Sequence, residues 1–306
     1  MKKVGFVYDD VFLLHDMPPG HPESRERLVA IIDSLKKTDL WDKLIHLKPN
    51  IAEKADILSV HTNSYVEKIM KFSGYFDADT YVSNRSVEVA LYAAGAVIEA
   101  VLKCKKGELD RAFCAVRPPG HHAEANRAMG FCIFNNVAIG ARYAQKIGYR
   151  RVFIIDFDVH HGNGTQHIFE EEDTVFYFST HQYPHYPGTG SDLERGRGKG
   201  SNYTYNIPMH YGSGDKEYFT AFHDFLPGLI RNFQPDIILV SAGYDLHAKD
   251  PLAGLRVTNE GVRSIVKSIL LSCNNIPHVF CLEGGYNLVS LSESVIITVE
   301  ELLRCE

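Results

Sequence analysis

The sequence has little of what marks a nucleic-acid-binding or membrane-spanning protein. Its 306 residues carry a formal net charge of −6. They contain no basic stripe that could release counterions from a polyanion, so nucleic acid is excluded as a partner. The longest apolar stretches are far shorter than a membrane span, which argues against a membrane protein. We find no internal repeat and no low-complexity tract.

Cysteine is scarce and scattered. None of the six cysteines forms a Cys-x-x-Cys pair, so a structural zinc knuckle is not expected. Cys114 and Cys281 lie in apolar strand-like runs, where cysteine behaves as a small hydrophobe. The start at Met1–Val4 shows no secretory signal, and we therefore expect the reducing cytoplasm as the compartment.

What is present is an ordinary globular composition, 45% hydrophobic and 23% charged. Six apolar runs predict buried strands, most of them continuous as in a parallel sheet covered on both faces: Val4–Tyr8, Ala112–Val116, Val152–Phe157, Thr174–Ser179, Ile237–Ser241 and Val279–Leu282. Six helical patterns alternate with them: Ser24–Lys37, Ser86–Lys103, Asn136–Lys146, Lys216–Phe233, Asn259–Leu271 and Leu291–Leu303. This alternation predicts one α/β domain over residues 1–306, with a central, mainly parallel sheet and helices on both faces.

Two long segments read as loops. Gly188–Asn202 is rich in Gly, Ser and Arg and could pass for a domain linker, but strand and helix patterns resume on both sides of it. Asp9–Pro22 is rich in Asp, Pro, His and Gly. Loops of this length in a compact domain are often functional.

Polar groups follow the predicted strands at the points where the strands end. His121 follows the 112–116 strand, and Asp156, Asp158 and His160 straddle the end of the 152–157 strand. Asp245 follows the 237–241 strand, and Tyr286 follows the 279–282 strand. Ligand crevices in open α/β sheets form at this carboxyl edge, so the placement predicts one shared site.

Asp158 and His160 are two residues apart, and in an extended segment such residues point to the same side. One carboxylate and one imidazole can therefore reach the same ion, and Asp245 can supply a third ligand from a neighbouring strand. Three N/O ligands leave a position open, as in catalytic zinc sites. Such a ligand set also accepts Fe(II) or Co(II).

The adjacent His121 and His122 follow Pro118-Pro119-Gly120, where the prolines stiffen the chain and Gly120 permits a strained turn. Adjacent histidines usually face apart, but a tight turn can bring both to one cleft. Either could move protons there, and we assign His122 as the base and His121 as its electrostatic support. Tyr286, after Gly284-Gly285, is placed to stabilise an oxyanion.

Taken together, these residues resemble the histone deacetylase superfamily, whose members share the arginase–deacetylase α/β fold. The resemblance runs from Pro19–Glu23 to Tyr286–Leu288 and is carried, in order, by five motifs: Arg117–Ala123, Ala128–Cys132, Asp156–Gly164, Ser241–Asp245 and Glu283–Tyr286.

The resemblance implies a zinc-dependent amidohydrolase that acts on acyl-lysine or a similar acylated amine. Zinc would be held by Asp158, His160 and Asp245, with His121 and His122 as the tandem catalytic histidines and Tyr286 as the carbonyl-polarising phenol. Other implied roles are a tunnel wall at Gly130, Phe131 and Tyr186, and a monovalent cation (K⁺ or Na⁺) near Asp156, Ser179 and Thr180.

Asn163 and the run Ala128–Ala138 place the chain within that family, and Leu252 bears on its substrate. Asn163 stands where class I enzymes carry Asp, and it makes the chain class II-like. Because a neutral Asn stabilises imidazolium less than a carboxylate does, His122 is expected to be the more readily neutral base. Leu252 stands at the position where the eukaryotic polyamine deacetylase has an acidic gatekeeper residue. Because an apolar Leu does not attract a cationic polyamine, the resemblance implies acyl-lysine rather than acetylpolyamine as substrate.

Four alternatives remain at this stage. A binuclear manganese ureohydrolase of the arginase type would need further carboxylates after Asp245, and none follow as a dense cluster. A non-catalytic acyl-lysine reader conflicts with the filled catalytic positions. An acetoin-utilisation-type deacetylase, or an acetylpolyamine amidohydrolase, would use the same chemistry on another substrate. The sequence leaves open the acyl length, the native metal and the oligomeric state.

Overall fold

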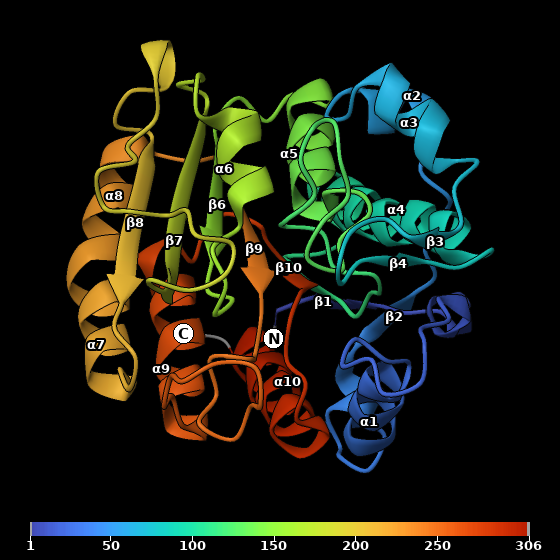
Figure 1. The fold of residues 1–306 in the computed structure, drawn as a ribbon. Helices are drawn as coiled ribbons and strands as arrows, with labels where there is room; N and C mark the ends of the chain where they lie inside the picture. Colours follow the sequence, from blue (N-terminus) through green and yellow to red (C-terminus); the bar gives the residue numbers. More distant parts are fainter. Residues whose placement is uncertain (1, 305–306) are drawn as a thin grey trace.

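A computed structural model describes residues 2–304. Met1, Cys305 and Glu306, at the ends of the predicted domain, lie outside the described residues. The central feature is an eight-stranded sheet in which all neighbouring strands pair in parallel. Its order is β2-β1-β5-β10-β9-β6-β7-β8 (Figure 1). The strands are β1 (Val4–Val7), β2 (Ile45–Leu47), β5 (Arg111–Cys114), β6 (Val152–Asp156), β7 (Val175–Gln182), β8 (Thr204–Met209), β9 (Ile237–Ala242) and β10 (His278–Leu282).

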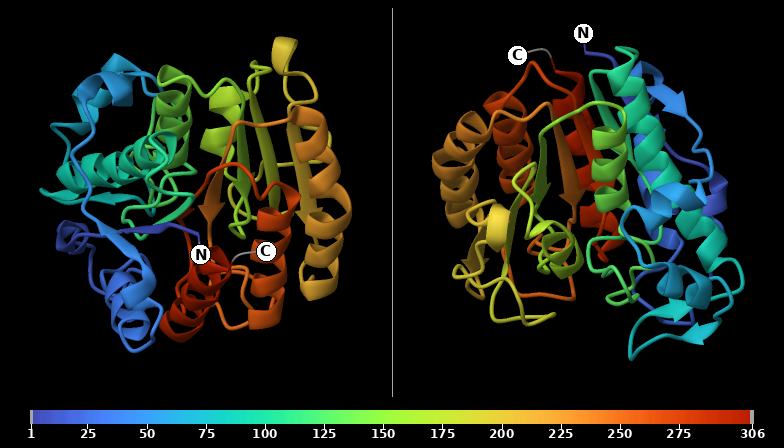
Figure 2. Two further views of the ribbon diagram at one scale, coloured as in Figure 1. Left: turned by 180° about the vertical axis from the view of Figure 1, so that it is seen from behind. Right: turned by 90° about the horizontal axis from the view of Figure 1, so that it is seen from above.

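Helices cover both faces of this sheet (Figures 1 and 2). On one face α4 packs against α5, and both contact strands; on the other, α1, α10 and α9 pack side by side. The helices are α1 (Glu26–Leu35), α2 (Lys54–Leu58), α3 (Asn63–Ile69), α4 (Ser86–Lys105), α5 (Asn136–Lys146), α6 (Asn163–Phe169), α7 (Asp215–Phe219), α8 (Leu226–Phe233), α9 (Asn259–Ser272) and α10 (Leu288–Leu303). A small antiparallel pair, β3 (Gly74–Tyr75) and β4 (Tyr81–Val82), lies apart.

The predicted strands and helices are confirmed, with three kinds of difference. The edge strands β2 and β8 were missed, because their residues are partly exposed and carry no continuous apolar run. The short helices α2, α3 and α6 were missed as well. The predicted helix 216–233 is divided by a π-helical segment, Thr220–Phe225, and the 9–22 loop contains a 3₁₀ helix, Asp10–Leu14.

Side-chain caps fix where several helices begin. The side chain of Asn135 accepts from the Ala138 amide at the start of α5, and that of Asn287 accepts from the Ser290 amide at the start of α10. Such caps satisfy amides that lack a partner within the helix. Both helices follow polar loops at the carboxyl edge of the sheet, so the caps also fix those loops.

A buried ion cluster joins the N-terminal loop to the rest of the molecule. The Glu23 carboxylate accepts two hydrogen bonds from Arg117, at 2.6 and 2.7 Å, and one from Arg27 at 3.0 Å. Arg27 also donates to the carbonyl oxygens of Glu283 and Gly285. Burial disfavours the Glu23 carboxylate, but the two guanidinium groups outweigh it and lower the pKa of Glu23 to about 2.

We expect Glu23→Gln to lower the free energy of unfolding by about 3–5 kcal/mol, because two buried guanidinium groups lose their counterion. Since the folded-state pKa of Glu23 is depressed, this carboxylate stabilises the wild type above its unfolded value of 4.5 and ceases to do so as pH falls towards about 2. Urea denaturation at neutral pH measures the effect. Glu26→Gln, at the exposed start of α1, is the control and should change stability little.

Candidate active site

The loops that follow five strands meet at the carboxyl edge of the sheet (Figure 1). The loop after β5 carries His121 and His122, and the segment after β6 carries Asp158 and His160. Asp245 follows β9, Tyr186 follows β7, and Tyr286 follows β10. The parallel direction of the strands thus brings together residues that are far apart in the sequence, as the predicted strand-end placement required.

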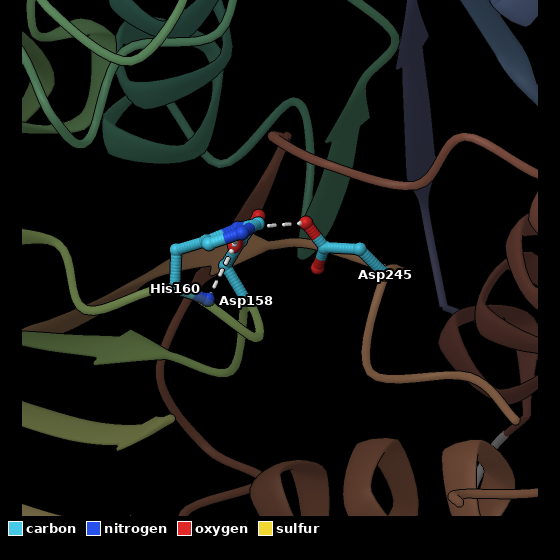
Figure 3. A group of neighbouring side chains, drawn as sticks. All are labelled: Asp158, His160 and Asp245. Atoms are coloured by element: carbon cyan, nitrogen blue, oxygen red, sulfur yellow. Dashed lines mark hydrogen bonds and ion pairs between the residues drawn. The ribbon is translucent and has the colours of Figure 1, made fainter. Parts of the chain in front are cut away.

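Asp158, His160 and Asp245 converge on one point (Figure 3). Their potential ligand atoms all lie within 4.8 Å of one another. His160 Nδ1 is 3.1 Å from Asp158 Oδ1 and 3.2 Å from Asp245 Oδ2. Two carboxylates and one imidazole at this spacing match a site for a divalent cation.

The protein alone does not balance the charge of this group. Asp245 Oδ2 is buried and makes no hydrogen bond. Burial and the neighbouring Asp158 carboxylate raise the pKa of Asp245 to about 7. Burial opposes the protonation of His160, but the neighbouring Asp158 and Asp245 carboxylates outweigh it and raise the pKa of that imidazole to about 10. A bound cation would relieve the same crowding by displacing these protons.

Backbone groups hold the carboxylates in place. The Gly284 amide donates to Asp158 Oδ2 at 2.8 Å, and the Val159 amide donates to Asp245 Oδ1 at 3.0 Å. A Cβ atom at position 284 would clash with Asp245 Oδ2, so only glycine allows this close approach. The Gly-Gly motif before Tyr286 therefore makes room for the carboxylates as well as for the loop.

Both histidines of the tandem pair face the same site. Their ring centroids are 4.0 Å apart. His121 Nδ1 lies 3.0 Å from Asp156 Oδ2, which also accepts from the Tyr177 hydroxyl. His122 Nδ1 lies 2.8 Å from Asn163 Oδ1. The usual arrangement of adjacent histidines, facing apart, does not occur here.

The two imidazoles differ in charge. Burial opposes protonation of His121, but the Asp156 and Asp158 carboxylates outweigh it and raise the pKa of His121 to about 10. Burial, together with the positive charges of His121 and His160, holds the pKa of His122 well below its usual value. His121 is therefore an imidazolium at neutral pH, whereas His122 is neutral and able to accept a proton.

Glycine is required at position 120 for a different reason from the one predicted. Its φ does not lie in the left-handed region, so strain does not require glycine there. Instead, a Cβ atom would lie 2.5 Å from the Asn136 amide nitrogen. Glu283 fixes the same turn, because its carboxylate accepts from the Gly120 amide at 2.6 Å and from the His121 amide at 3.2 Å.

Tyr286 lines the same pocket as the histidines. Its backbone amide donates to Asp250 Oδ2 at 2.6 Å, and the Arg27 guanidinium lies 4.9 Å from the centre of its ring. Burial raises the pKa of the Tyr286 phenol well above its usual value, so the hydroxyl stays protonated. A protonated phenol is a hydrogen-bond donor that can stabilise an oxyanion.

The two tandem histidines, His160 and Tyr286 line one pocket of about 240 Å³. Two aromatic side chains form its walls: the Phe131 ring centroid is 5.9 Å from that of Tyr286, and the Tyr186 centroid is 5.1 Å from that of His122. The predicted Gly130 and Leu252 also line it. The full lining is Asp79, Pro119, His121, His122, Gly130, Phe131, His160, His185, Tyr186, Leu252, Gly284 and Tyr286.

Two of the lining residues, Asp79 and His185, were missed in the sequence. Asp79 lies between β3 and β4 and follows no strand predicted from the sequence. A position after a strand end therefore could not identify it as a site residue. Burial and the nearby Asp77 raise the pKa of Asp79. The ring centroid of His185 lies 5.3 Å from that of the metal-ligand candidate His160. The sequence signal for His185 was its place beside Tyr186.

The residues predicted for a monovalent cation are neighbours in the sheet. Asp156 on β6 and Ser179 on β7 are register partners. The Ser179 hydroxyl lies 2.8 Å from His181 Nδ1, and the buried Thr180 hydroxyl makes no hydrogen bond. This polar, buried surround behind His121 is compatible with an ion, and the cation site stays a prediction.

Comparisons with known proteins agree on one family. The histone deacetylase domain model matches residues 21–302. A probable deacetylase of Archaeoglobus fulgidus is 39% identical, over 93% of this chain and 81% of its own length. The human polyamine deacetylase HDAC10 is 38% identical, over 95% of this chain and 46% of its own length. The crystal structure of an HDA15 HD domain superposes with a TM-score of 0.94 at 36% identity, covering 98% of this chain and 90% of that one. Among residues 2–304, no helix is long and apolar enough to cross a membrane.

We expect Asp245→Asn to weaken divalent-metal binding by more than about a hundredfold, because even residues behind metal ligands typically contribute 10–100-fold. In the wild type, affinity should weaken as pH falls below about 7, where a proton competes for Asp245. Competition with a chromophoric chelator measures both effects. Asp79→Asn removes a carboxylate from the same pocket and should keep the affinity; equal affinity in Asp245→Asn and wild type would contradict the assignment.

Proposed function

Because this chain belongs to the histone deacetylase family, we propose that it is a zinc-dependent deacetylase that hydrolyses the amide of an acylated lysine side chain. One observation carries the proposal: the group formed by Asp158, His160 and Asp245 reaches the pocket through His160, and a neutral and a charged histidine line the same pocket. We further propose that residues 1–306 form one deacetylase domain, since the strands of one continuous sheet lead to the proposed zinc ligands, the histidine pair and Tyr286.

The residues that would hold zinc are Asp158, His160 and Asp245. Their fit is supported by the unpaired Asp245 oxygen and by the crowding of two buried carboxylates. When bound, zinc supplies Lewis acidity that polarises an amide carbonyl and makes water more acidic. Within residues 2–304 this is the one such group of His, Cys, Asp and Glu side chains, which favours one catalytic ion over an arginase-type pair.

The proton transfers fall to His122. It is neutral, so it can take a proton from the attacking water and later return it to the departing amine. His121, charged and paired with Asp156, stabilises negative charge that develops near it. This division of roles keeps the assignment made from the sequence and gives it an electrostatic reason.

Tyr286 supplies a further group to the same pocket. Its hydroxyl donates a hydrogen bond to the carbonyl oxygen as that oxygen gains negative charge. Phe131 and Tyr186 would enclose the apolar stem of the acylated lysine between their rings. We also retain the monovalent cation beside Asp156, Ser179 and Thr180, whose charge would support the carboxylates around His121.

A second substrate class is supported by a specific observation. Leu252 offers no charge to a polyamine, which favours acyl-lysine. Asp79, however, places a carboxyl group in the pocket lining, where it could attract a cationic acetylpolyamine. Acetylpolyamine hydrolysis is therefore the alternative function.

The reducing cytoplasm remains the compartment that we expect for this protein.

We expect Tyr286→Phe to lower kcat on an acetyl-lysine peptide by about 10²–10³, the usual effect of removing one oxyanion donor, with a small change in KM. Steady-state kinetics of the zinc-loaded protein measure it. Tyr211→Phe, which removes a hydroxyl from an exposed tyrosine, is the control. A Tyr286→Phe enzyme with wild-type kcat would refute the role of the phenol.

We expect wild type to prefer the acetyl-lysine peptide over acetylspermidine, and Leu252→Glu to shift kcat/KM towards acetylspermidine by at least about tenfold, because a new carboxylate attracts the polyamine. The panel also contains longer acyl-lysines and is run with and without a hydroxamate chelator, which should abolish activity. Faster hydrolysis of acetylspermidine by wild type would establish the alternative substrate class. No hydrolysis of any acylated amine by zinc-loaded protein would reject the proposed function.

A further inference from the structure

Asn163 connects His122 to a carboxylate that the proposed chemistry does not use. Its Oδ1 atom faces His122 Nδ1 at 2.8 Å. Its Nδ2 atom faces three acceptors: Glu124 Oε1, the His122 carbonyl oxygen at 3.4 Å and the Met129 sulfur at 3.4 Å. Asn163 is buried, so its amide depends on these protein partners rather than on solvent.

The partners determine which way the amide points. An amide can present either its oxygen or its NH₂ group to a neighbour, but an ionised carboxylate accepts only. His167 and Asn163 both contribute to lowering the pKa of Glu124, against the effect of burial, so Glu124 is a carboxylate at neutral pH. Glu124 therefore requires the NH₂ group of Asn163, and the oxygen of the same amide must turn to His122.

The orientation of Asn163 in turn fixes the tautomer of His122. An amide oxygen only accepts, so His122 Nδ1 must carry the hydrogen. The remaining ring nitrogen, Nε2, then keeps its lone pair, and it lies on the side of the ring away from Asn163, in a side chain that lines the pocket. This is the tautomer that a general base needs.

We propose that Glu124 is a positioning residue that sets the tautomer of His122 through Asn163, an inference that rests on the proposed deacetylase function. The backbone of Glu124 is itself anchored: its amide donates to the Arg127 carbonyl at 3.0 Å, and its carbonyl oxygen lies 3.0 Å from His61 Nδ1. The chain from Glu124 through Asn163 to His122 is thus held at its outer end.

His167 provides the matched control. Its Nδ1 atom lies 2.9 Å from the same Glu124 Oε1 oxygen, and its side chain is 38% exposed. Losing His167 leaves Glu124 a carboxylate that still accepts from Asn163. His167→Gln should therefore preserve the amide orientation, although it removes one partner of Glu124.

The test replaces the hydrogen-bond acceptor at position 124, first by an apolar side chain and then by a donor. Glu124→Met removes the acceptor and should lower kcat about threefold, whereas Glu124→Lys offers only donors, turns the Asn163 oxygen outward and should lower kcat about thirtyfold, within what a general base contributes. In both variants KM should stay near wild type. Adding Asn163→Asp to Glu124→Lys supplies a carboxylate that accepts both from the introduced ammonium group and from His122, so the double variant should recover to within about fivefold of wild type.

Nitrogen NMR of ¹⁵N-histidine-labelled full-length protein reads the tautomer directly, with the His122 signals assigned through a His122→Gln sample. We expect Nδ1–H in wild type, His167→Gln and the double variant, and Nε2–H in Glu124→Lys. An unchanged Nδ1–H tautomer in Glu124→Lys, or a double variant no better than Glu124→Lys, would overturn the proposal. The spectra need no substrate, so a wild type inactive on every acylated amine would reject the deacetylase function while the role of Glu124 is still decided.

Discussion

The site depends on one constraint of the sheet: all eight strands run in the same direction. Their carboxyl ends therefore form a single edge, and every loop that leaves this edge begins near the others. Asp158 and Asp245 come from the loops of adjacent strands, β6 and β9, and their carboxylates converge. The amide of Val159, next to Asp158, donates to Asp245 although 86 residues separate the two in the sequence. No local sequence feature could create this proximity without the parallel order.

The second constraint is the cost of burying charge. Asp156, Asp158, Asp245 and Glu283 are all buried within the same region. Backbone amides, the Tyr177 hydroxyl and the His121 imidazolium compensate some of these carboxylates, while Asp245 Oδ2 has no hydrogen-bond donor. An uncompensated charge in a desolvated interior lowers the stability of the fold. These buried carboxylates therefore indicate a functional rather than a stabilising role. Glu23, by contrast, is matched by two guanidinium groups and serves the fold.

Much of this arrangement was predictable from the sequence, and the reasons are specific. Continuous apolar runs identified the central strands, and the residues after them gave the candidate metal ligands, the histidine pair and Tyr286. The edge strands β2 and β8 were not predicted, because each has a neighbouring strand on one side only and their residues are only partly buried. Asp79 and the contact between Glu124 and Asn163 escaped for another reason. They depend on how irregular loops pack, and neither periodicity nor strand ends describe that.

The place of β10 has a consequence for how the molecule is made. Among residues 2–304 this strand is the last in sequence order, yet it lies in the interior of the sheet, paired with β5 on one side and β9 on the other. During synthesis on the ribosome, the β2-β1-β5 portion and the β9-β6-β7-β8 portion emerge without the strand that joins them. The nascent protein must keep two open sheet edges soluble until β10 has been made, and only then can the pocket at the carboxyl edge form.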